Sequence, residues 1–409
     1  MIEHFFRHEY ARLVAILSCR VGVRYLEDTE DAVQSAIMLA MEKWAISGAP
    51  DNPEAWLFRV AYNNLMGELR QRSGRDRILE QTAKQETHST TSDPEVFLGG
   101  EVSDHLLRML FVCCDEALPV PSSQALALKI LCGFKIREIA LLLFTSEANI
   151  YKRLGRARKG LRELPFQPGE LSNAQYVSRL ATVHQTLYLL FTEGYLSSQT
   201  NAAIRRELCQ EAIRLATLLA EHPWGKAPET FALLALMHLH LARMTAREDP
   251  SGGLLLLEEQ NREHWDQRDI QIGLTWLGKS AWGNRFSRYH AEAGIAAEHC
   301  LAPSFHQTCW RKVVECYELL EQMAPSALHR LNRAVAVAEW QGPQQGLAVL
   351  KGFEPPTWLA GSHLWHGVLA DLHRRCGNTE TANRFRETAI QLAPTAAVKK
   401  LLLRRLMES

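Results

Sequence analysis

The sequence predicts an all-α protein, and three observations support that fold class. Residues 133–162 contain two short segments of helical apolar spacing that meet at a tight turn. From Leu171 to the end, amphipathic helical segments follow one another. Within residues 363–394, small residues recur at the spacing of two paired helices. Because 409 residues are too many for a single core, we expect several helical modules.

The N-terminal part contains an acidic helix start. Residues 27–34, EDTEDAVQ, open a helix that is expected to continue to Trp44. Carboxylates in a first turn are stabilised by the helix dipole, so an ordinary helix start explains this composition by itself.

A second helix begins at Pro53, a residue that suits the first helical turn, and becomes basic toward its end. Amides and aromatic rings beside cations suit single-stranded or melted DNA, whose bases stack and expose their pairing edges. The candidate residues for that contact are Tyr62, Asn63, Asn64, Arg70 and Arg72. Gly67 interrupts this helix and costs roughly 1 kcal/mol of helix stability relative to alanine.

The two segments that meet at the tight turn predict a helix-turn-helix. The first buries a stripe that includes Ile139 and Ala140, and the small Ala140 lets a second helix cross closely. Ser146 is placed to cap the second helix, and Ile150 and Leu154 supply its buried face.

The outer face of that second helix is strongly cationic. Its candidate nucleic-acid contacts are Ser146, Asn149, Lys152, Arg153, Arg156 and Arg158. Cations three and four residues apart repel along a helix, so the pattern is stabilised only beside an anion. Residues 129–164 hold nine cations and three carboxylates, whereas the whole chain balances 46 against 46. A solvated cationic face is the alternative, but this segregated charge favours a DNA-binding module.

Two blocks of sequence together resemble the sigma factors of bacterial RNA polymerase, in the extracytoplasmic-function group. EDAVQ at residues 30–34, PEAWLFRVAYNNL at residues 53–65 and LRQR at residues 69–72 resemble region 2 of that family. GFKIREIA at residues 133–140 and NIYKRLGRARKGLR at residues 149–162 resemble region 4. The order and the spacing of the blocks both agree with the family.

The resemblance implies roles for the candidate residues. It implies that Asp31 and Gln34 bind core RNA polymerase, that the 62–72 helix captures the melted −10 element, and that the 149–158 helix binds the −35 element. In the tail, LYLLFTEGY at residues 187–195 is similar to part of the domain that follows region 4 in a branch of extended factors.

We therefore expect four parts. Residues 1–75 correspond to region 2, residues 76–103 to a flexible linker, residues 104–165 to the region 4 helix-turn-helix, and residues 166–409 to a larger, tetratricopeptide-like helical domain. Stacked helical hairpins present a concave surface, so the last part is expected to be a regulatory domain with a protein or peptide partner. A helical core without a ligand is the alternative.

The sequence predicts neither a metal site nor a membrane span. The nine cysteines include no C-x-x-C pair and are scattered through apolar runs, which indicates reduced thiols in the cytoplasm. Cys113 and Cys114 are neighbours on a helix and point about 100° apart, which does not suit one metal ion. No segment reaches the roughly 18 uncharged apolar residues that cross a bilayer.

Catalytic motifs are also missing from the sequence. It has no Gly-rich phosphate loop, nucleophile elbow or H-E-x-x-H, so we expect neither enzyme activity nor a cofactor. His238 and His240 lie two apart on a helix and face different ways, which indicates core histidines. The polar run at residues 258–269 is expected to form a buried hydrogen-bond and ion-pair network that fixes helix packing.

Together these observations predict a cytoplasmic alternative sigma factor. Its partners would be core RNA polymerase and promoter DNA, and its C-terminal domain would modulate its activity. One alternative is a helix-turn-helix regulator with a sensory helical domain that does not act as a sigma factor. Another is an interaction scaffold whose DNA modules have decayed.

Overall fold

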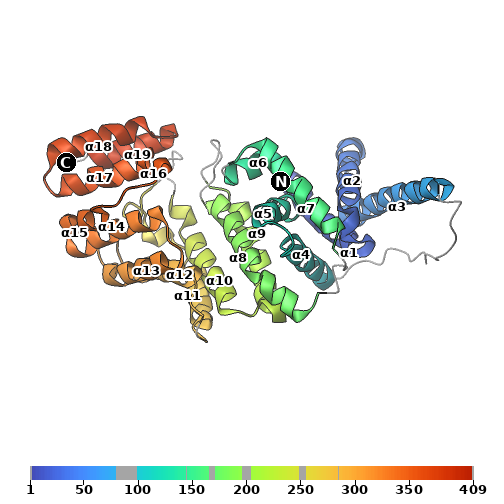
Figure 1. Cartoon of the computed structure of the whole chain (residues 1–409), viewed down its shortest axis with the longest axis horizontal. Helices are drawn as coiled ribbons and strands as arrows, with labels where there is room; N and C mark the ends of the chain where they lie inside the picture. Colours follow the sequence, from blue (N-terminus) through green and yellow to red (C-terminus); the bar gives the residue numbers. More distant parts are fainter. Residues whose placement is uncertain are drawn as a thin grey trace. The chain divides into compact units, whose positions relative to one another are not determined.

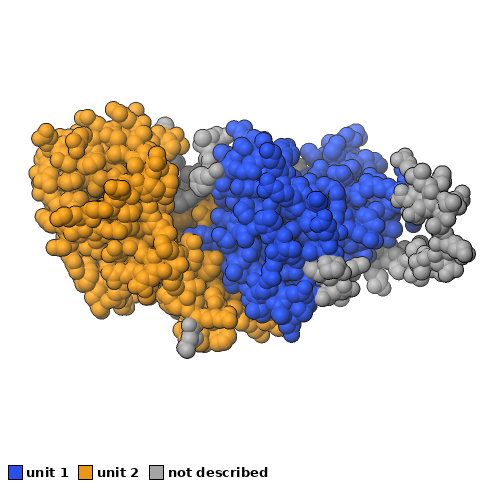
Figure 2. Space-filling view, viewed as in Figure 1, with its two compact units in different colours: residues 1–190 blue, residues 191–409 orange. Residues whose placement is uncertain are grey.

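The computed structural model describes residues 2–79, 99–143, 145–164, 171–195, 204–247, 255–283 and 285–407, and every regular element among them is a helix (Figure 1). This confirms the predicted all-α fold class. The chain divides into two compact units, Met1–Leu190 and Phe191–Ser409 (Figure 2).

The first unit contains α1 to α8, and the second continues from the end of α8 to α19. The helices of the first unit are α1 (Ile2–Val21), η1 (Val23–Tyr25), α2 (Leu26–Ser47), α3 (Pro53–Leu79), α4 (Gly99–Cys113), α5 (Val120–Leu131), α6 (Ile136–Leu142), α7 (Glu147–Arg162) and α8 (Asn173–Tyr195). Those of the second are α9 (Arg206–Glu221), η2 (Pro223–Gly225), α10 (Pro228–Ala242), η3 (Met244–Arg247), η4 (Arg262–His264), α11 (Gln267–Ser280), α12 (Arg288–Leu301), α13 (Trp310–Met323), α14 (Ala327–Gln341), α15 (Pro343–Leu350), α16 (Thr357–Ala360), α17 (His363–Arg375), α18 (Thr379–Gln391) and α19 (Ala396–Met407).

Helix α1 is the centre of the first unit. It packs against α2 and α3 and also against α4 and α5. Leu13, Val14 and Leu17 are almost completely buried, because apolar residues occur on several sides of this helix and each side meets a neighbour. The helices of the first predicted module, α1 to α3, are therefore packed on α4 and α5 of the module that contains the helix-turn-helix. Most of the predicted linker, residues 80–98, lies outside the described residues.

The ends of α2 and α3 have local causes. Gly48 stops α2 because its φ of 77° lies in the left-handed region that glycine adopts without strain. The side chain of Asn52 accepts a hydrogen bond from the Ala55 amide at 3.0 Å and so caps the start of α3. Pro53 occupies the first position of α3, as the sequence predicts. The helix then runs through Gly67 to Leu79, beyond the expected limit of the first module at residue 75.

The first part of α8 belongs to the first compact unit. Tyr176 packs edge-on against Phe111, with ring centroids 4.9 Å apart. Arg179 forms an ion pair with Asp115 just after α4, and both side chains are almost fully buried. The boundary between the units consequently falls at residues 190 and 191, inside α8, whereas the sequence suggests a module boundary at residue 165. The difference arises because this ion pair and this aromatic contact hold α8 on α4.

Helix α10 is the centre of the second unit. It packs against α9, α11 and α12, and ten of its fifteen residues are buried while the others are half-buried, which confirms the central position predicted for residues 229–246. Asp266 caps α11 by accepting hydrogen bonds from the Arg268 and Asp269 amides. The imidazole of His238 lies 2.9 Å from the carboxylate of Asp269, an interaction that joins α10 to α11.

Two helical hairpins follow, α14 with α15 and α17 with α18. Gly346 lets the first hairpin close, because a Cβ there would lie 2.7 Å from both the Ala334 carbonyl oxygen and the Ala338 Cβ. Gly377, with φ of 79°, makes the turn of the second, and the buried Ala370 faces α19. The predicted hairpin at residues 363–394 is confirmed. Its assignment to the tetratricopeptide class stays a prediction.

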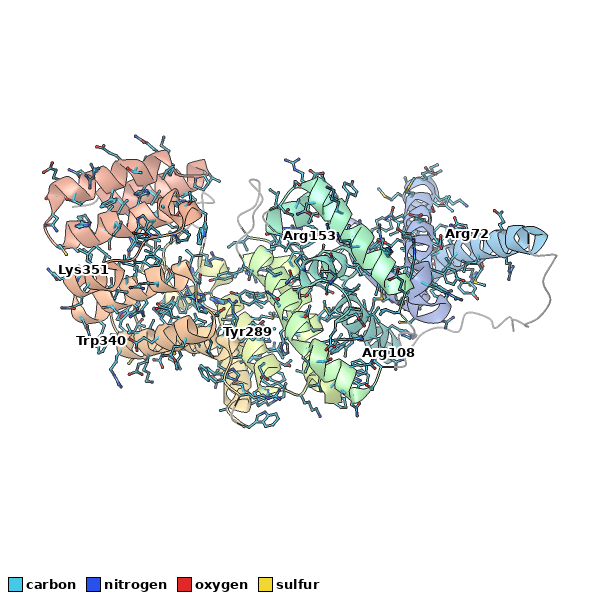
Figure 3. All side chains as sticks on the ribbon, viewed as in Figure 1. Arg72, Arg108, Arg153, Tyr289, Trp340 and Lys351 are labelled. Atoms are coloured by element: carbon cyan, nitrogen blue, oxygen red, sulfur yellow. The ribbon has the colours of Figure 1, made fainter. Side chains whose placement is uncertain are left out.

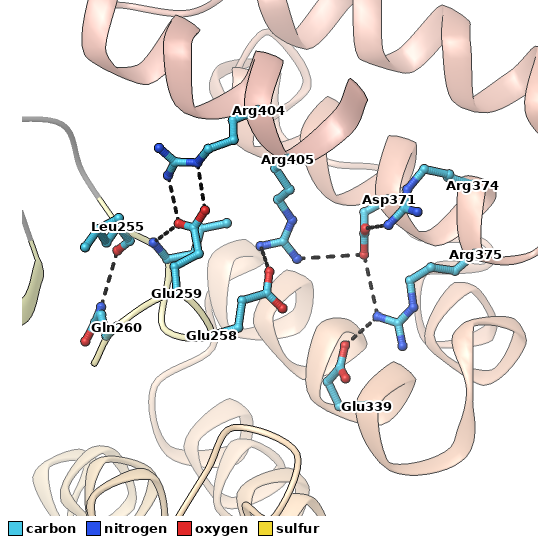
Figure 4. Close-up of polar contacts among 11 residues, drawn as sticks. Leu255, Glu258, Glu259, Gln260, Glu339, Asp371, Arg374, Arg375, Arg404 and Arg405 are labelled. Carbon is cyan, nitrogen blue, oxygen red and sulfur yellow. Dashed lines mark hydrogen bonds and ion pairs between the residues drawn. The ribbon is translucent and has the colours of Figure 1, made fainter. Parts of the chain in front are cut away.

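Ion pairs fasten the last helix, α19 (Figure 4). Arg404 donates to Glu259 at 2.8 Å, and Arg405 lies 3.4 Å from Glu258. Asp371 on α17 accepts a hydrogen bond from Arg374 at 3.0 Å. The predicted polar network at residues 258–269 is thus confirmed at its first two carboxylates, although these side chains are partly exposed rather than buried.

Three histidines, the buried His184 and His299 and the half-buried His240, are neutral at neutral pH. Burial lowers the pKa of His184 to about 4. Burial, with Arg243 nearby, lowers the pKa of both His240 and His299 to about 3. His240 also contacts the ring of Tyr195, with centroids 4.6 Å apart. These side chains behave as apolar core residues at neutral pH.

Replacing Gly67 with alanine is expected to stabilise the protein. The position is exposed within a helix, and a Cβ there would meet no atom within 4 Å. Removing the backbone entropy of glycine should raise the free energy of unfolding by about 0.5–1 kcal/mol. Urea denaturation measures the change. Gly377→Ala is the matched control and should destabilise, because its positive φ strains a side chain. A lower midpoint for Gly67→Ala would contradict the prediction.

Acidification is expected to destabilise the fold between about pH 6.5 and pH 4. Unfolding lets His184, His240 and His299 take up protons that the folded protein excludes, so stability is lost as the pH falls. Each histidine contributes up to about 1.4 kcal/mol per pH unit. Urea denaturation from pH 7.5 to pH 4.5 should show a shallower pH slope for His240→Phe than for the wild type. The exposed His264→Phe should retain the wild-type slope.

Candidate nucleic-acid interface

The helix-turn-helix is formed by α6 and α7. Ile139 and Ala140 of α6 are buried, as are Ile150 and Leu154 of α7, which confirms the predicted apolar stripes. Helix α7 packs on α5 and α6. The hydroxyl of Ser146 accepts a hydrogen bond from the Asn149 amide at 3.2 Å, which confirms the predicted cap.

The N-terminal half of α7 presents a free cationic surface. Lys152 and Arg156 are exposed and Arg153 is half-buried, and Figure 3 labels Arg153 on this helix. Within the described part of the chain, none of these three cations has an ion pair or a hydrogen bond to its side chain. The side-chain amide of Asn149 donates to the Thr145 hydroxyl at 2.8 Å, so this residue is held in place at the start of the helix. A free cationic surface of this kind suits an anionic partner.

The C-terminal half of α7 is arranged differently. Arg158 donates to Glu30 of α2 at 2.6 Å and lies 3.7 Å from Glu27. Arg162 also pairs with Glu27. The Glu30 side chain is only 3% exposed, so loss of these partners would leave a buried carboxylate without its ion pair. Arg158, predicted as a nucleic-acid contact, therefore differs from Lys152, Arg153 and Arg156 in that its guanidinium is paired with carboxylates of α2.

A polar hollow of about 670 Å³ surrounds these ion pairs. Its lining brings together residues of η1, α2, α3, α5 and α7, namely Arg24, Tyr25, Glu27, Asp28, Glu30, Asp31, Gln34, Arg72, Lys129, Arg158 and Arg162. Behind it, the Tyr10 hydroxyl donates to Glu30 at 2.8 Å. Burial is the largest cause that raises the pKa of Tyr10 well above its usual value, and the negative charge of the adjacent Glu30 carboxylate raises it further.

The candidate residues on α3 do not share one face. Asn63 and Arg70 are exposed and lie seven residues apart, so they point to the same side of the helix. Asn64 is exposed about 100° away, and Tyr62 stacks on Phe58 with ring centroids 5.9 Å apart. The guanidinium of Arg72, labelled in Figure 3, forms an ion pair with Asp28 of α2 at 2.5 Å.

Helix α2 has an exposed face, of which only the first part was predicted from the sequence. Asp31 and Gln34 are exposed, as predicted. The same face continues with Met38 and Met41, which are 63% and 57% exposed and follow at helical spacing. Exposed methionines are typical of adaptable binding surfaces. Helical periodicity from Asp31 would have identified them, because spacings of three, seven and ten residues fall on one side of a helix.

The described residues contain no group of three or more His, Cys, Asp or Glu side chains that could hold a metal ion. Cys113 and Cys114 are buried, and burial raises the pKa of the Cys114 thiol to about 11, which keeps it protonated. None of the helices in the described ranges is both long and apolar enough to span a bilayer.

Comparisons with known proteins place two domains on this structure. Residues 108–161 match the model of the family described as Sigma-70, region 4, a DNA-binding, non-catalytic domain, and this range contains α5, α6 and most of α7. Residues 179–281 match a family of unknown function, DUF6596. A protein of Rhizobium meliloti (strain 1021), named Uncharacterized protein R00370, is 35% identical over 382 residues, which cover 91% of this chain and 88% of the relative. No solved structure matches the chain.

Proposed function

Because the chain belongs to the same family as R00370 and carries a sigma-70 region 4 domain, we propose that it is an alternative sigma factor of bacterial RNA polymerase. The observation that carries this proposal is the match of region 4 to the capped helix α7 with its free cations. In this proposal α7 binds the −35 element through Lys152, Arg153 and Arg156, with Ser146 and Asn149 at the start of the helix.

The N-terminal helices supply the other two contacts of the proposed function. The face of α3 that carries Asn63 and Arg70 is proposed to capture unpaired bases of the −10 element, with Tyr62 and Asn64 beside it. The face of α2 that begins with Asp31 and Gln34 is proposed to bind core polymerase. The same face continues through the exposed Met38 and Met41. This supports the assignment, because exposed apolar side chains that lie together on one helix face mark a site of protein binding.

The functional modules are proposed to follow the limits expected from the sequence, 1–75, 76–103, 104–165 and 166–409. The C-terminal helical domain is proposed to modulate activity through a protein or peptide partner. Paired helices with small residues at their contacts support a tetratricopeptide-like arrangement.

Transcription with purified components tests the proposal. The protein with core RNA polymerase is expected to initiate run-off transcription from a double-stranded promoter selected from genomic fragments. A helix-turn-helix regulator that is not a sigma factor would bind DNA alone and fail to associate with core enzyme in a pull-down. Absence of both core binding and initiation would reject the proposal.

Removing a cation from α7 should weaken DNA binding and its salt dependence. Arg156→Ala or Lys152→Ala is expected to lower the affinity of the holoenzyme for its promoter and to reduce the salt slope by about one unit, because one phosphate contact disappears. Filter binding at several salt concentrations measures both quantities. Arg311→Ala, which removes an exposed cation from α13, is the control. Identical slopes for all variants would argue against the contact.

Changing the exposed face of α2 should weaken polymerase binding. Asp31→Ala and Met38→Glu are each expected to reduce affinity for core enzyme about tenfold, because these substitutions remove a charged contact or place a charge in an apolar one. Fluorescence anisotropy with labelled protein measures this affinity. Lys43→Ala, on another side of the same helix, should bind like the wild type. Equal loss in the control would mean that the helix itself is disturbed.

A further inference from the structure

A buried arginine in the second unit has no acidic partner. Arg243 follows the last residue of α10 and is only 7% exposed. Within the described parts of the chain, its guanidinium forms neither an ion pair nor a hydrogen bond, and its Nε atom is buried without a partner. A buried cation in this condition is unfavourable, because it has lost its hydration without gaining a hydrogen bond or a counter-charge. An anion at this position would therefore be strongly stabilised.

A second arginine lies beside the first. The guanidinium carbons of Arg243 and Arg262 lie 5.1 and 4.4 Å from the centre of the Trp265 ring. Arg262 donates to the carbonyl oxygens of His299 and Ala302 near the end of α12, but its Nη2 atom is buried without a partner. Burial lowers the pKa of Arg262, and the charge of Arg243 lowers it further. Two guanidinium groups that repel each other are thus held against one indole ring.

Other polar atoms at the same place also lack protein partners. The indole Nε1 of Trp265, which can only donate, is buried without an acceptor, and the Nδ1 atoms of His240 and His299 are buried without partners. Burial first, and the charge of Arg243 second, lower the pKa of both imidazoles to about 3, so both lie near that cation and are uncharged. Native proteins seldom leave buried polar atoms unsatisfied, and here several are gathered around two cations.

We propose that Arg243, Arg262 and Trp265 form a binding site for a phosphate group, either inorganic phosphate or the phosphate of a small metabolite. Guanidinium groups donate paired hydrogen bonds to phosphate oxygens, and two guanidinium charges match a phosphate charge of about −1.5 to −2. The indole N–H supplies a donor for a further oxygen. Water can satisfy the hydrogen bonds but leaves the two cations repelling each other, whereas a phosphate group removes both penalties.

The surroundings leave the positive charge available to a small ligand. The acidic residues on either side of Trp265 in this segment, Glu263 and Asp266, are exposed. Glu263 bonds to Asn261, and Asp266 caps α11, so neither neutralises the arginines. Arg262 is only half-buried, which gives a small anion an approach from solvent. The inference goes beyond the proposed function, because it concerns the second unit alone and stands whether or not the protein is a sigma factor.

Thermal unfolding and calorimetry of the full-length protein test the site. At constant ionic strength, inorganic phosphate is expected to raise the Tm of the wild type along a saturating curve, because a ligand that binds only the folded state stabilises it. Isothermal titration calorimetry should give one phosphate per chain and at least about tenfold weaker binding of acetate, which carries a single charge. Glycerol phosphate distinguishes the sources, since a metabolite site binds it more tightly than inorganic phosphate and a free-anion site binds it less tightly.

Two substitutions separate the site from a general salt effect. Arg243→Met retains apolar bulk and is expected to weaken phosphate binding roughly tenfold or more. Trp265→Phe keeps an aromatic ring and removes only the N–H, so it should fold even if the first variant does not, and should weaken binding about three- to tenfold. Arg268→Gln, at an exposed position on α11, is the matched control and should bind like the wild type.

Phosphate also stabilises folded proteins without binding, because it is excluded from their surfaces. An equal, unsaturated rise in Tm for the wild type, Arg243→Met and Trp265→Phe, with no heat of binding, would overturn the site. That result would leave the proposed function untouched, because run-off transcription with core polymerase tests the first unit separately.

Discussion

Burial of α1 is the constraint on which the first compact unit depends. This helix is apolar on several sides, so a single neighbouring surface cannot cover it. Helices α2 and α3 cover one part, and α4 and α5 cover another. The arrangement brings the start of α2 to the end of α7, 128 residues away along the chain, and makes the Arg158–Glu30 hydrogen bond possible. Apolar packing determines the approach, and ion pairs determine which polar groups meet.

The second unit is stabilised by a different combination of apolar burial and ion pairs. Its centre, α10, is buried along its whole length, and neutral histidines fill part of the surrounding core. Its last helix is held both by the buried Leu402 and Leu406 and by paired charges, among which Arg404–Glu259 connects residues 145 positions apart. The half-exposed ion pairs contribute less to the stability of this unit than the burial of apolar side chains does.

Local rules predicted much of the fold and of the interface. The cap at Ser146, the turn at Gly377 and the central helix near residues 229–246 follow from capping, glycine conformation and hydrophobic composition. Periodicity did not reveal α1, because its apolar residues are not confined to one stripe. Nor could it pair α7 with α2, since a pattern identifies an apolar face but not the surface that it meets. The exposed Met38 was not predicted as part of this face, although it follows Asp31 at helical spacing, because the acidic residues by themselves are explained by an ordinary helix start.

The buried pair of Asp115 and Arg179 has a consequence for where the protein can be divided. A shortened chain that ends at Leu164 lacks α8, and the Asp115 carboxylate, the Phe111 ring and the Cys114 thiol then lose the cover that this helix provides. Such a fragment would aggregate or unfold for reasons unrelated to regulation. A fragment that ends after Tyr195 retains the complete α8, so a comparison of its activity with that of the full chain isolates the contribution of the remaining C-terminal helices.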